Sequence, residues 1–146
     1  MSDFAITRPE PKLSRESALL QVQKILQFYD YDLAKQSSKT KEYLEDALEL
    51  ITEGFQREAL ELPEGEKFVI RQNLKNSPRL TDKTITYTEW QGELKVWANG
   101  LTTTNSISKM YSLLGRMSGN TEDYFTAMGR KDQELADALG LFFLSF

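Results

Sequence analysis

The sequence has no cysteine and no histidine among its 146 residues. Without cysteine the chain has no disulfide, no thiolate metal site and no thiol nucleophile. Without histidine it lacks the side chain most often used for proton transfer near neutral pH, which is also the commonest metal ligand. These absences disfavour most hydrolytic and metal-dependent mechanisms, so we expect a protein that is not an enzyme and that binds neither metal nor cofactor.

Long apolar segments are missing as well. The run at 141–144 is far too short to cross a bilayer, and the first fifteen residues lack the apolar region of a secretory signal. Only four prolines and eight glycines occur, with 40% hydrophobic and 27% charged residues, which argues against disorder and against a fibrous repeat. We therefore expect a soluble, cytoplasmic protein with one domain over 1–146 and an extended N-terminal arm over 1–13.

Apolar residues recur at three- and four-residue spacing through most of the chain, which predicts an all-α domain of about five to six helices. Ser14 is the expected N-cap of the first helix, and Pro63 with Gly65 is the expected end of the second. Gly119 and Gly129 are expected to end later helices. The expected helices cover residues 15–35, 39–62, 86–101, 107–118 and 121–128, followed by a last helix after Gly129.

The segment 67–88 gives a mixed signal. Its first half fits either a short strand or a short helix with Ile70 and Leu74 on one face, and we favour the helix. Thr84 to Tyr87 alternate as a strand would, but Thr86 and Glu89 form a capping box that favours a helix. A short β hairpin within 67–88 therefore stays open. After the box, Trp90, Leu94, Trp97 and Leu101 form one face that we assign to core packing.

Charge is strongly segregated in the middle of the chain. Nine acidic residues and one arginine occupy 42–66, whereas five basic residues and one aspartate occupy 67–83. The carboxylates of the second helix fall away from its apolar face, so we expect an exposed acidic helix and no metal site. Arg71, Lys75 and Arg79 are candidates for phosphate contact, but the chain is acidic overall and nucleic-acid binding is only an alternative.

The C-terminus carries more apolar surface than one helix face needs. Leu139, Phe142, Phe143 and Phe146 are our candidate partner-binding residues. The last helix would either dock across the domain's own core or present this surplus to another protein. Removal of 141–146 is then expected to impair folding in the first case and assembly in the second.

The last third of the chain resembles the helical ends of the small tail-assembly chaperones of tailed bacteriophages. The residues that carry the resemblance are Leu114, Met117, Ser118-Gly119, Asp132 and Phe142-Phe143. It covers about a quarter of the chain. The resemblance implies a virion assembly factor, and we keep this as an alternative. The leading hypothesis is a non-catalytic protein-interaction or assembly protein, a subunit or accessory factor of a larger complex that binds a protein partner or copies of itself.

Overall fold

The structure is a computed structural model that describes residues 13–65, 67–89 and 106–145. The expected arm over 1–13 lies outside this range except for Leu13, whose N–H donates to the carbonyl of Gln56 at 3.1 Å. The elements in chain order are α1 (Arg15–Phe28), the 3₁₀ turn η2 (Leu33–Lys35), α2 (Ser38–Gln56), β1 (Leu60–Glu61), β2 (Ile70–Asn73), β3 (Thr84–Tyr87), α4 (Ser106–Ser118), α5 (Glu122–Thr126) and α6 (Arg130–Leu144).

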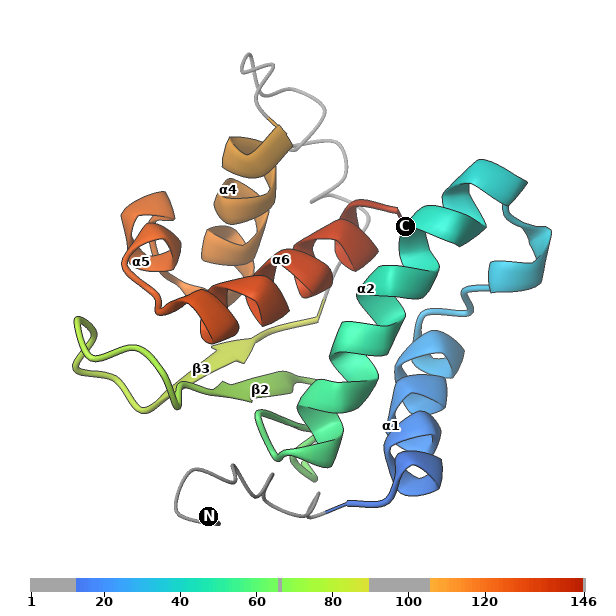
Figure 1. The fold of residues 1–146 in the computed structure, drawn as a ribbon, viewed down its shortest axis with the longest axis horizontal. Coiled ribbons are helices and arrows are strands. Elements are labelled where there is room, and N and C mark those ends of the chain that lie inside the picture. Colours follow the sequence, from blue (N-terminus) through green and yellow to red (C-terminus); the bar gives the residue numbers. More distant parts are fainter. Residues whose placement is uncertain (1–12, 66, 90–105, 146) are drawn as a thin grey trace, which may run out of the picture.

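The helices form a bundle beside a small sheet (Figure 1). Helices α1 and α2 run antiparallel as a hairpin, α2 packs on α6, and α6 packs on α4. The sheet has the order β1-β2-β3 with both pairings antiparallel, and β3 contacts α4. The predicted fold is therefore confirmed as mainly helical, but it is not all-α.

One cluster of buried side chains joins these elements. All the described helices and strands except the short η2 turn contribute aliphatic or aromatic side chains to it. The largest fully buried side chains are Tyr87, Phe55, Phe125, Phe142, Phe143 and Ile25. Burial of such side chains is worth ~1.5–3 kcal/mol each, which makes this cluster the main stabilising feature.

The segment that we favoured as a short helix is a strand, and that prediction was wrong. In β2, Ile70 and Gln72 are buried while Arg71 and Asn73 are half-buried, which is the period of two that a strand requires. Ile70 pairs with Tyr87 and Gln72 with Ile85, so long-range pairing decides the conformation. The sheet also extends beyond 67–88, because β1 lies in the region assigned to the second helix.

The capping box at Thr86 does not begin a helix there. Thr86 lies in β3 opposite Arg71, and Ile85 and Tyr87 face the core on either side of it. The strand alternative for 84–87 is thus the correct one. As a strand, this segment pairs its backbone N–H and C=O groups with those of β2. The predicted face of Trp90, Leu94, Trp97 and Leu101 lies outside the described residues.

The first two α-helices, α1 and α2, both end earlier than predicted, and for the same reason. After α1, Asp30 adopts a positive φ of 49°, and after α2, Glu58 adopts a positive φ of 57°. In each case a residue with a side chain takes the left-handed conformation in which helices commonly stop, although glycine is usual there. The second helix thus ends at Gln56, ahead of Pro63.

Ser14 and Gly119 mark helix ends where the sequence predicts them, but the prediction for Gly129 was wrong. Helix α5 ends at Thr126, and Gly129 is the N-cap of α6 with an extended backbone. Ser14 Oγ accepts the N–H of Ser17 at 3.1 Å and caps α1. Gly119, with φ 78°, follows α4, and the N–H of Asn120 donates to the carbonyl of Gly115 at 2.9 Å. This last bond is the Schellman arrangement that left-handed glycine permits.

Candidate protein-binding surface

The C-terminal candidates lie mostly inside the molecule. Leu139 is fully buried, and Phe142 and Phe143 are each 1% exposed. Phe143 meets Tyr29 edge-on with ring centroids 6.2 Å apart, and Phe142 meets Tyr31 at 5.8 Å. These three side chains therefore belong to the domain's own core, while Phe146 lies outside the described residues.

The basic candidates do not form a helical face, because Arg71 is in β2 and the other two follow that strand. Arg71 forms an ion pair with Glu61 across the β1-β2 ladder, and this guanidinium lowers the pKa of the Glu61 carboxyl. Lys75 Nζ donates to the carbonyl of Arg57 at 2.6 Å, and Arg79 is exposed. Two of the three cations thus have partners within the fold.

The acidic side of α2 is exposed, as predicted. All five of its acidic residues are exposed, whereas Leu44, Ile51 and Phe55 of the same helix are buried. Over the described ranges, no group of three or more acidic side chains is placed to hold a metal ion. The exposed residues are Glu42, Glu45, Asp46, Glu49 and Glu53.

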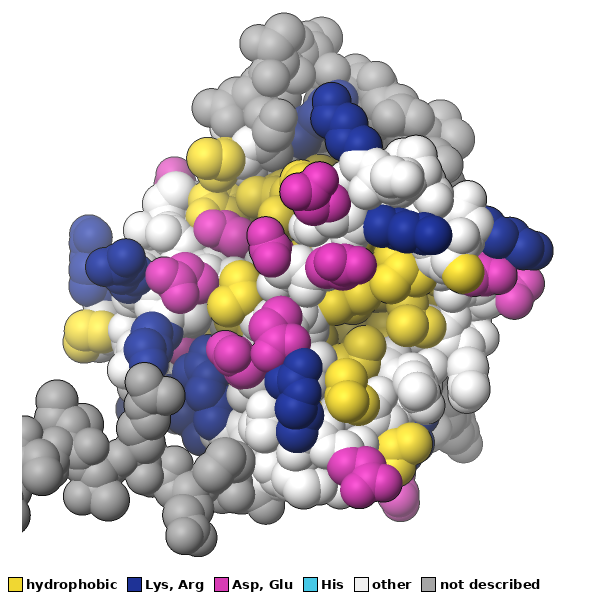
Figure 2. Space-filling model, turned by 45° about the vertical axis from the view of Figure 1, so that its right-hand side comes forward, with side chains coloured by type: hydrophobic (Ala, Val, Ile, Leu, Met, Phe, Trp, Pro, Cys, Tyr) yellow, Lys and Arg dark blue, Asp and Glu magenta, His cyan; other side chains and the backbone are white. Residues whose placement is uncertain are grey.

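An apolar groove runs between α1 and α2, and we call it the α1–α2 groove. Figure 2 shows hydrophobic side chains gathered around a hollow on this face, bordered by acidic side chains and by Lys or Arg side chains. The groove has a volume of about 290 Å³. Leu19 is 40% exposed and Leu26 and Leu48 are half-buried. The lining residues are Leu19, Val22, Gln23, Leu26, Glu45, Leu48, Glu49 and Thr52.

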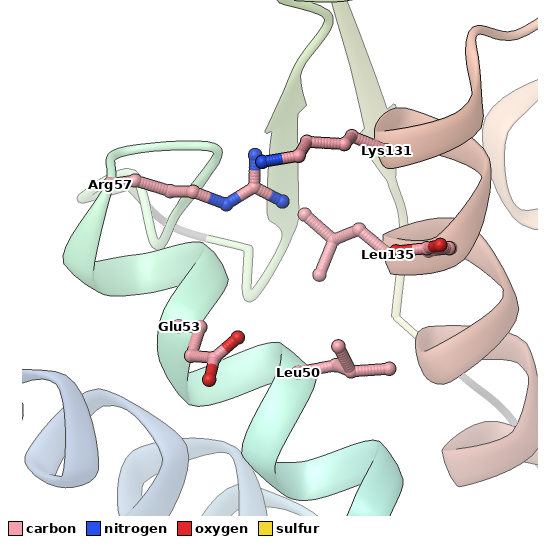
Figure 3. A pocket seen from close by; sticks show the side chains of 6 residues that line it. Leu50, Glu53, Arg57, Lys131 and Leu135 are labelled. Carbon is pink, nitrogen blue, oxygen red and sulfur yellow. The ribbon is translucent and has the colours of Figure 1, made fainter. Parts of the chain in front are cut away.

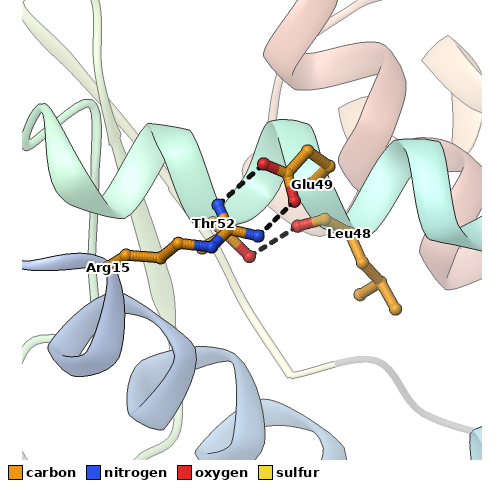
Figure 4. A network of polar contacts seen from close by, with 4 residues as sticks. All are labelled: Arg15, Leu48, Glu49 and Thr52. Carbon is orange, nitrogen blue, oxygen red and sulfur yellow. Dashed lines mark hydrogen bonds and ion pairs between the residues drawn. The ribbon is translucent and has the colours of Figure 1, made fainter.

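Polar contacts fix one end of this groove (Figure 4). Arg15 binds Glu49 through two parallel hydrogen bonds of 2.7 and 2.6 Å, which join the start of α1 to the middle of α2. The same contact lowers the pKa of Glu49 and raises that of Arg15. Thr52 Oγ1 donates to the carbonyl of Leu48 at 2.7 Å, so its hydroxyl is satisfied within α2. The free carboxylate on the groove margin is Glu45, which has no ion pair with any described residue.

A second hollow lies between α2 and α6 (Figure 3). It is smaller, about 160 Å³, and Leu50 and Leu135 form its apolar part. Its charged residues are two carboxylates and two cations, Glu53, Arg57, Glu134 and Lys131. Because these charges balance, the hollow has no preference for an anion or a cation that would identify a ligand.

Two tyrosines with raised pKa values donate hydrogen bonds to aspartates. Tyr111 Oη donates to Asp137 at 2.7 Å, and burial raises the pKa of Tyr111 far above its usual value. Tyr124 Oη donates to Asp82 at 3.0 Å, with its pKa raised to about 12 by burial and by that contact. Both phenols are protonated near neutral pH and act here as hydrogen-bond donors between elements, which is unlike a phenolate base.

The α1–α2 groove was not predicted as a site. In the sequence, Leu19 and Leu26 only widen the apolar stripe of the first helix, and a wide stripe is equally typical of a helix buried on both flanks. The signal that could have identified it is that this stripe is wider than one neighbouring helix covers.

Among the described helices, none combines the length and the apolar character that a membrane span requires. Comparison of the chain with known protein families, with curated proteins and with solved structures finds no match.

Proposed function

We propose that this chain is a non-catalytic protein-interaction or assembly protein that works as a subunit or accessory factor of a larger complex. The observation that supports this function is the α1–α2 groove, where leucine side chains of both helices are exposed or half-buried. Exposed apolar patches with a polar margin are typical of protein-binding sites. The proposed contact surface is therefore this groove and not the buried C-terminal aromatics.

The dimensions of the groove favour side chains of a partner over a small molecule. Small-molecule sites are enclosed clefts of ~300–1,000 Å³ that surround most of the ligand. At about 290 Å³, the α1–α2 groove lies just below this range, and it is open to the surface in Figure 2. A partner that covers Leu19 and Leu26 would remove their exposed apolar area from water. The free energy of this burial is ~25 cal/mol for each Å² and favours association.

The other functions considered from the sequence have less support. Nucleic-acid binding through Arg71 and Lys75 would compete with contacts that these residues already make to Glu61 and to the carbonyl of Arg57. Virion assembly, suggested by the resemblance to tail-assembly chaperones, is one form of the proposed class. Whether the chain takes part in virion assembly depends on the identity of its partner.

Photo-cross-linking tests the proposal. A photoreactive amino acid replaces Leu19 in the groove, and the same amino acid replaces Ile107, an exposed aliphatic residue of α4, as the matched control. In cells that express the full chain, we expect an adduct with another protein from position 19 but not from position 107. The adduct should disappear when Leu26 is also changed to Ser.

A further pair of variants separates binding from folding. Leu19→Glu places a charge in the groove, whereas Leu20→Glu places the same charge one residue away, where the side chain is 54% exposed and outside the groove. Both variants should melt like the unchanged protein, and only Leu19→Glu should lose the partner. If position 19 reacts only with residues of its own chain, the groove is covered internally and the proposal is wrong.

A further inference from the structure

We infer that the partner is an amphipathic α-helix whose apolar side enters the α1–α2 groove and whose flanks carry lysine or arginine. This inference rests on the proposed function and names the chemistry of the partner. Two observations carry it: the spacing of the groove residues along both helices, and the sign of the charge along one margin.

The spacing favours a helical partner. On α1 the groove is lined at Leu19, Val22 and Leu26, and on α2 at Glu45, Leu48 and Thr52, so each helix contributes positions i, i+3 or i+4, and i+7. These positions cover two turns, about 10 Å of helix axis. A straight groove between two antiparallel helices accepts a third helix through residues at the same spacing.

The charge selects a basic partner. Between Glu42 and Gln56, α2 contains carboxylates at five positions and no lysine or arginine. Arg15 neutralises Glu49, but Glu45 lines the groove without an ion pair to a described residue. Lysine or arginine beside the apolar stripe of a partner would lie next to this margin. Such complementarity mainly raises the association rate and excludes partners of the wrong charge.

The same charge disfavours a second copy of this chain as the occupant. In a two-fold dimer the same patch meets itself, so the acidic margin of one α2 would face that of the other. The basic residues of α2 are Lys39 and Lys41, both in its first turn, and Lys41 lies one helical turn before Glu45. In a two-fold contact centred on Glu45 and Glu49, these carboxylates would lie close to those of the other copy, and a basic helix from a different protein avoids that repulsion.

A displayed peptide library tests the inference on the full-length protein. Each probe is an 18-residue peptide with leucine at i, i+3, i+4, i+7 and i+11, and its flanking positions are randomised among Lys, Glu and Gln. The library is sorted for binding to the unchanged protein and against binding to Leu19→Glu. We expect lysine to be enriched several-fold over glutamate at the flanks.

Charge reversal then assigns the contact. Glu45→Lys should weaken binding of an enriched lysine peptide about three- to ten-fold at low salt, and the difference should shrink at high salt. Glu16→Lys, an equal change at an exposed α1 position outside the groove, is the control and should have little effect. A glutamate-flanked version of the peptide should bind Glu45→Lys better than it binds the unchanged protein.

The possible failures are distinct. If enriched peptides need Leu19 but show no lysine preference, the basic partner is wrong while the groove remains a binding surface. If no peptide binds in a Leu19-dependent way, the helical partner is wrong, whatever cross-linking shows. Cross-linking of position 19 to another copy would replace the basic helix by self-association, and the absence of any intermolecular adduct would remove the proposed function itself.

Discussion

The hydroxyl of Ser77 donates a hydrogen bond of 2.6 Å to Oδ2 of Asp132, across 55 positions of sequence. The Asp132 side chain is fully buried and also accepts the N–H groups of Asn76 at 2.9 Å and Lys75 at 3.4 Å. The N–H of Gly129 donates to Ser77 Oγ at 3.1 Å and completes the cluster. One carboxylate thereby holds the loop after β2 against the first turn of α6.

Replacing Asp132 should strongly destabilise the protein. Asp132→Ala leaves buried donors without an acceptor, and each unsatisfied group costs ~1–3 kcal/mol, so we expect a loss of about 3–5 kcal/mol in the free energy of unfolding. Asp132→Asn keeps one oxygen and should lie between. Urea denaturation measures both, with the exposed Glu122→Ala as control. A loss below about 1 kcal/mol for Asp132→Ala would show that the cluster is not a stabilising contact.

Gly129 should tolerate no side chain, for a purely steric reason. Its φ of −65° suits any residue, but a Cβ there would lie 1.5 Å from the carbonyl oxygen of Asn76. Gly129→Ala must displace that backbone, at ~1–3 kcal/mol or more. Gly65→Ala is the matched control, because a Cβ at Gly65 meets nothing within 4 Å. Thermal melts should show a lower Tm for Gly129→Ala alone, and equal melts would contradict the close approach.

The buried aromatics of α6 should matter for folding. Phe142→Ala and Phe143→Ala should each cost ~3–5 kcal/mol, against a typical total stability of ~5–15 kcal/mol. Removal of 141–146 should therefore leave the chain largely unfolded when alone. Phe28→Ala is the control, because Phe28 is 43% exposed and should cost less. Circular dichroism checks these expectations. A truncated chain that stays folded but loses its partner would instead return these residues to the binding surface.

Asp137 should make stability depend on pH in the opposite sense to an ordinary paired carboxylate. Burial raises its pKa in the folded protein, while the hydrogen bond from Tyr111 lowers it in part. Because folding disfavours the ionised form, this stability is present below the unfolded pKa of ~3.9 and is lost as the pH rises through the folded pKa. Asparagine does not ionise, so the Asp137→Asn variant does not lose this stability. Its free energy of unfolding relative to the unchanged protein should therefore increase between pH 3 and pH 7.

Tyr111→Phe provides the companion measurement. It removes the donor that favours ionised Asp137, so it should raise the pKa of Asp137 further and steepen the loss of stability with pH. Urea titrations at several pH values give both slopes. A difference between Asp137→Asn and the unchanged protein that does not vary with pH would show that this carboxyl titrates alike in the folded and unfolded chains.

Local signals in the sequence determine most of the helices. Ser14 caps the first helix through its own side chain, and Gly119 ends α4 in the left-handed conformation, so neither signal depends on distant residues. The apolar stripes then decide which side of each helix is buried, and α2 shows this with its exposed carboxylates opposite Leu44 and Ile51. Periodicity and capping act within a few residues, which is why they can be read without the fold.

The tertiary structure decides the sheet, the helix ends and the binding surface. Strand β2 exists because β1 and β3 supply hydrogen bonds on both sides, and no local signal at Ile70 records that pairing. The ends at Asp30 and Glu58 depend on left-handed residues that are not glycine. Whether Leu19 and Leu26 line a groove or a core depends on how completely α2 covers them. Phe142 and Phe143 are also apolar, but the packing around α6 buries them. Hydrophobicity belongs to the residue, but exposure belongs to the packing around it.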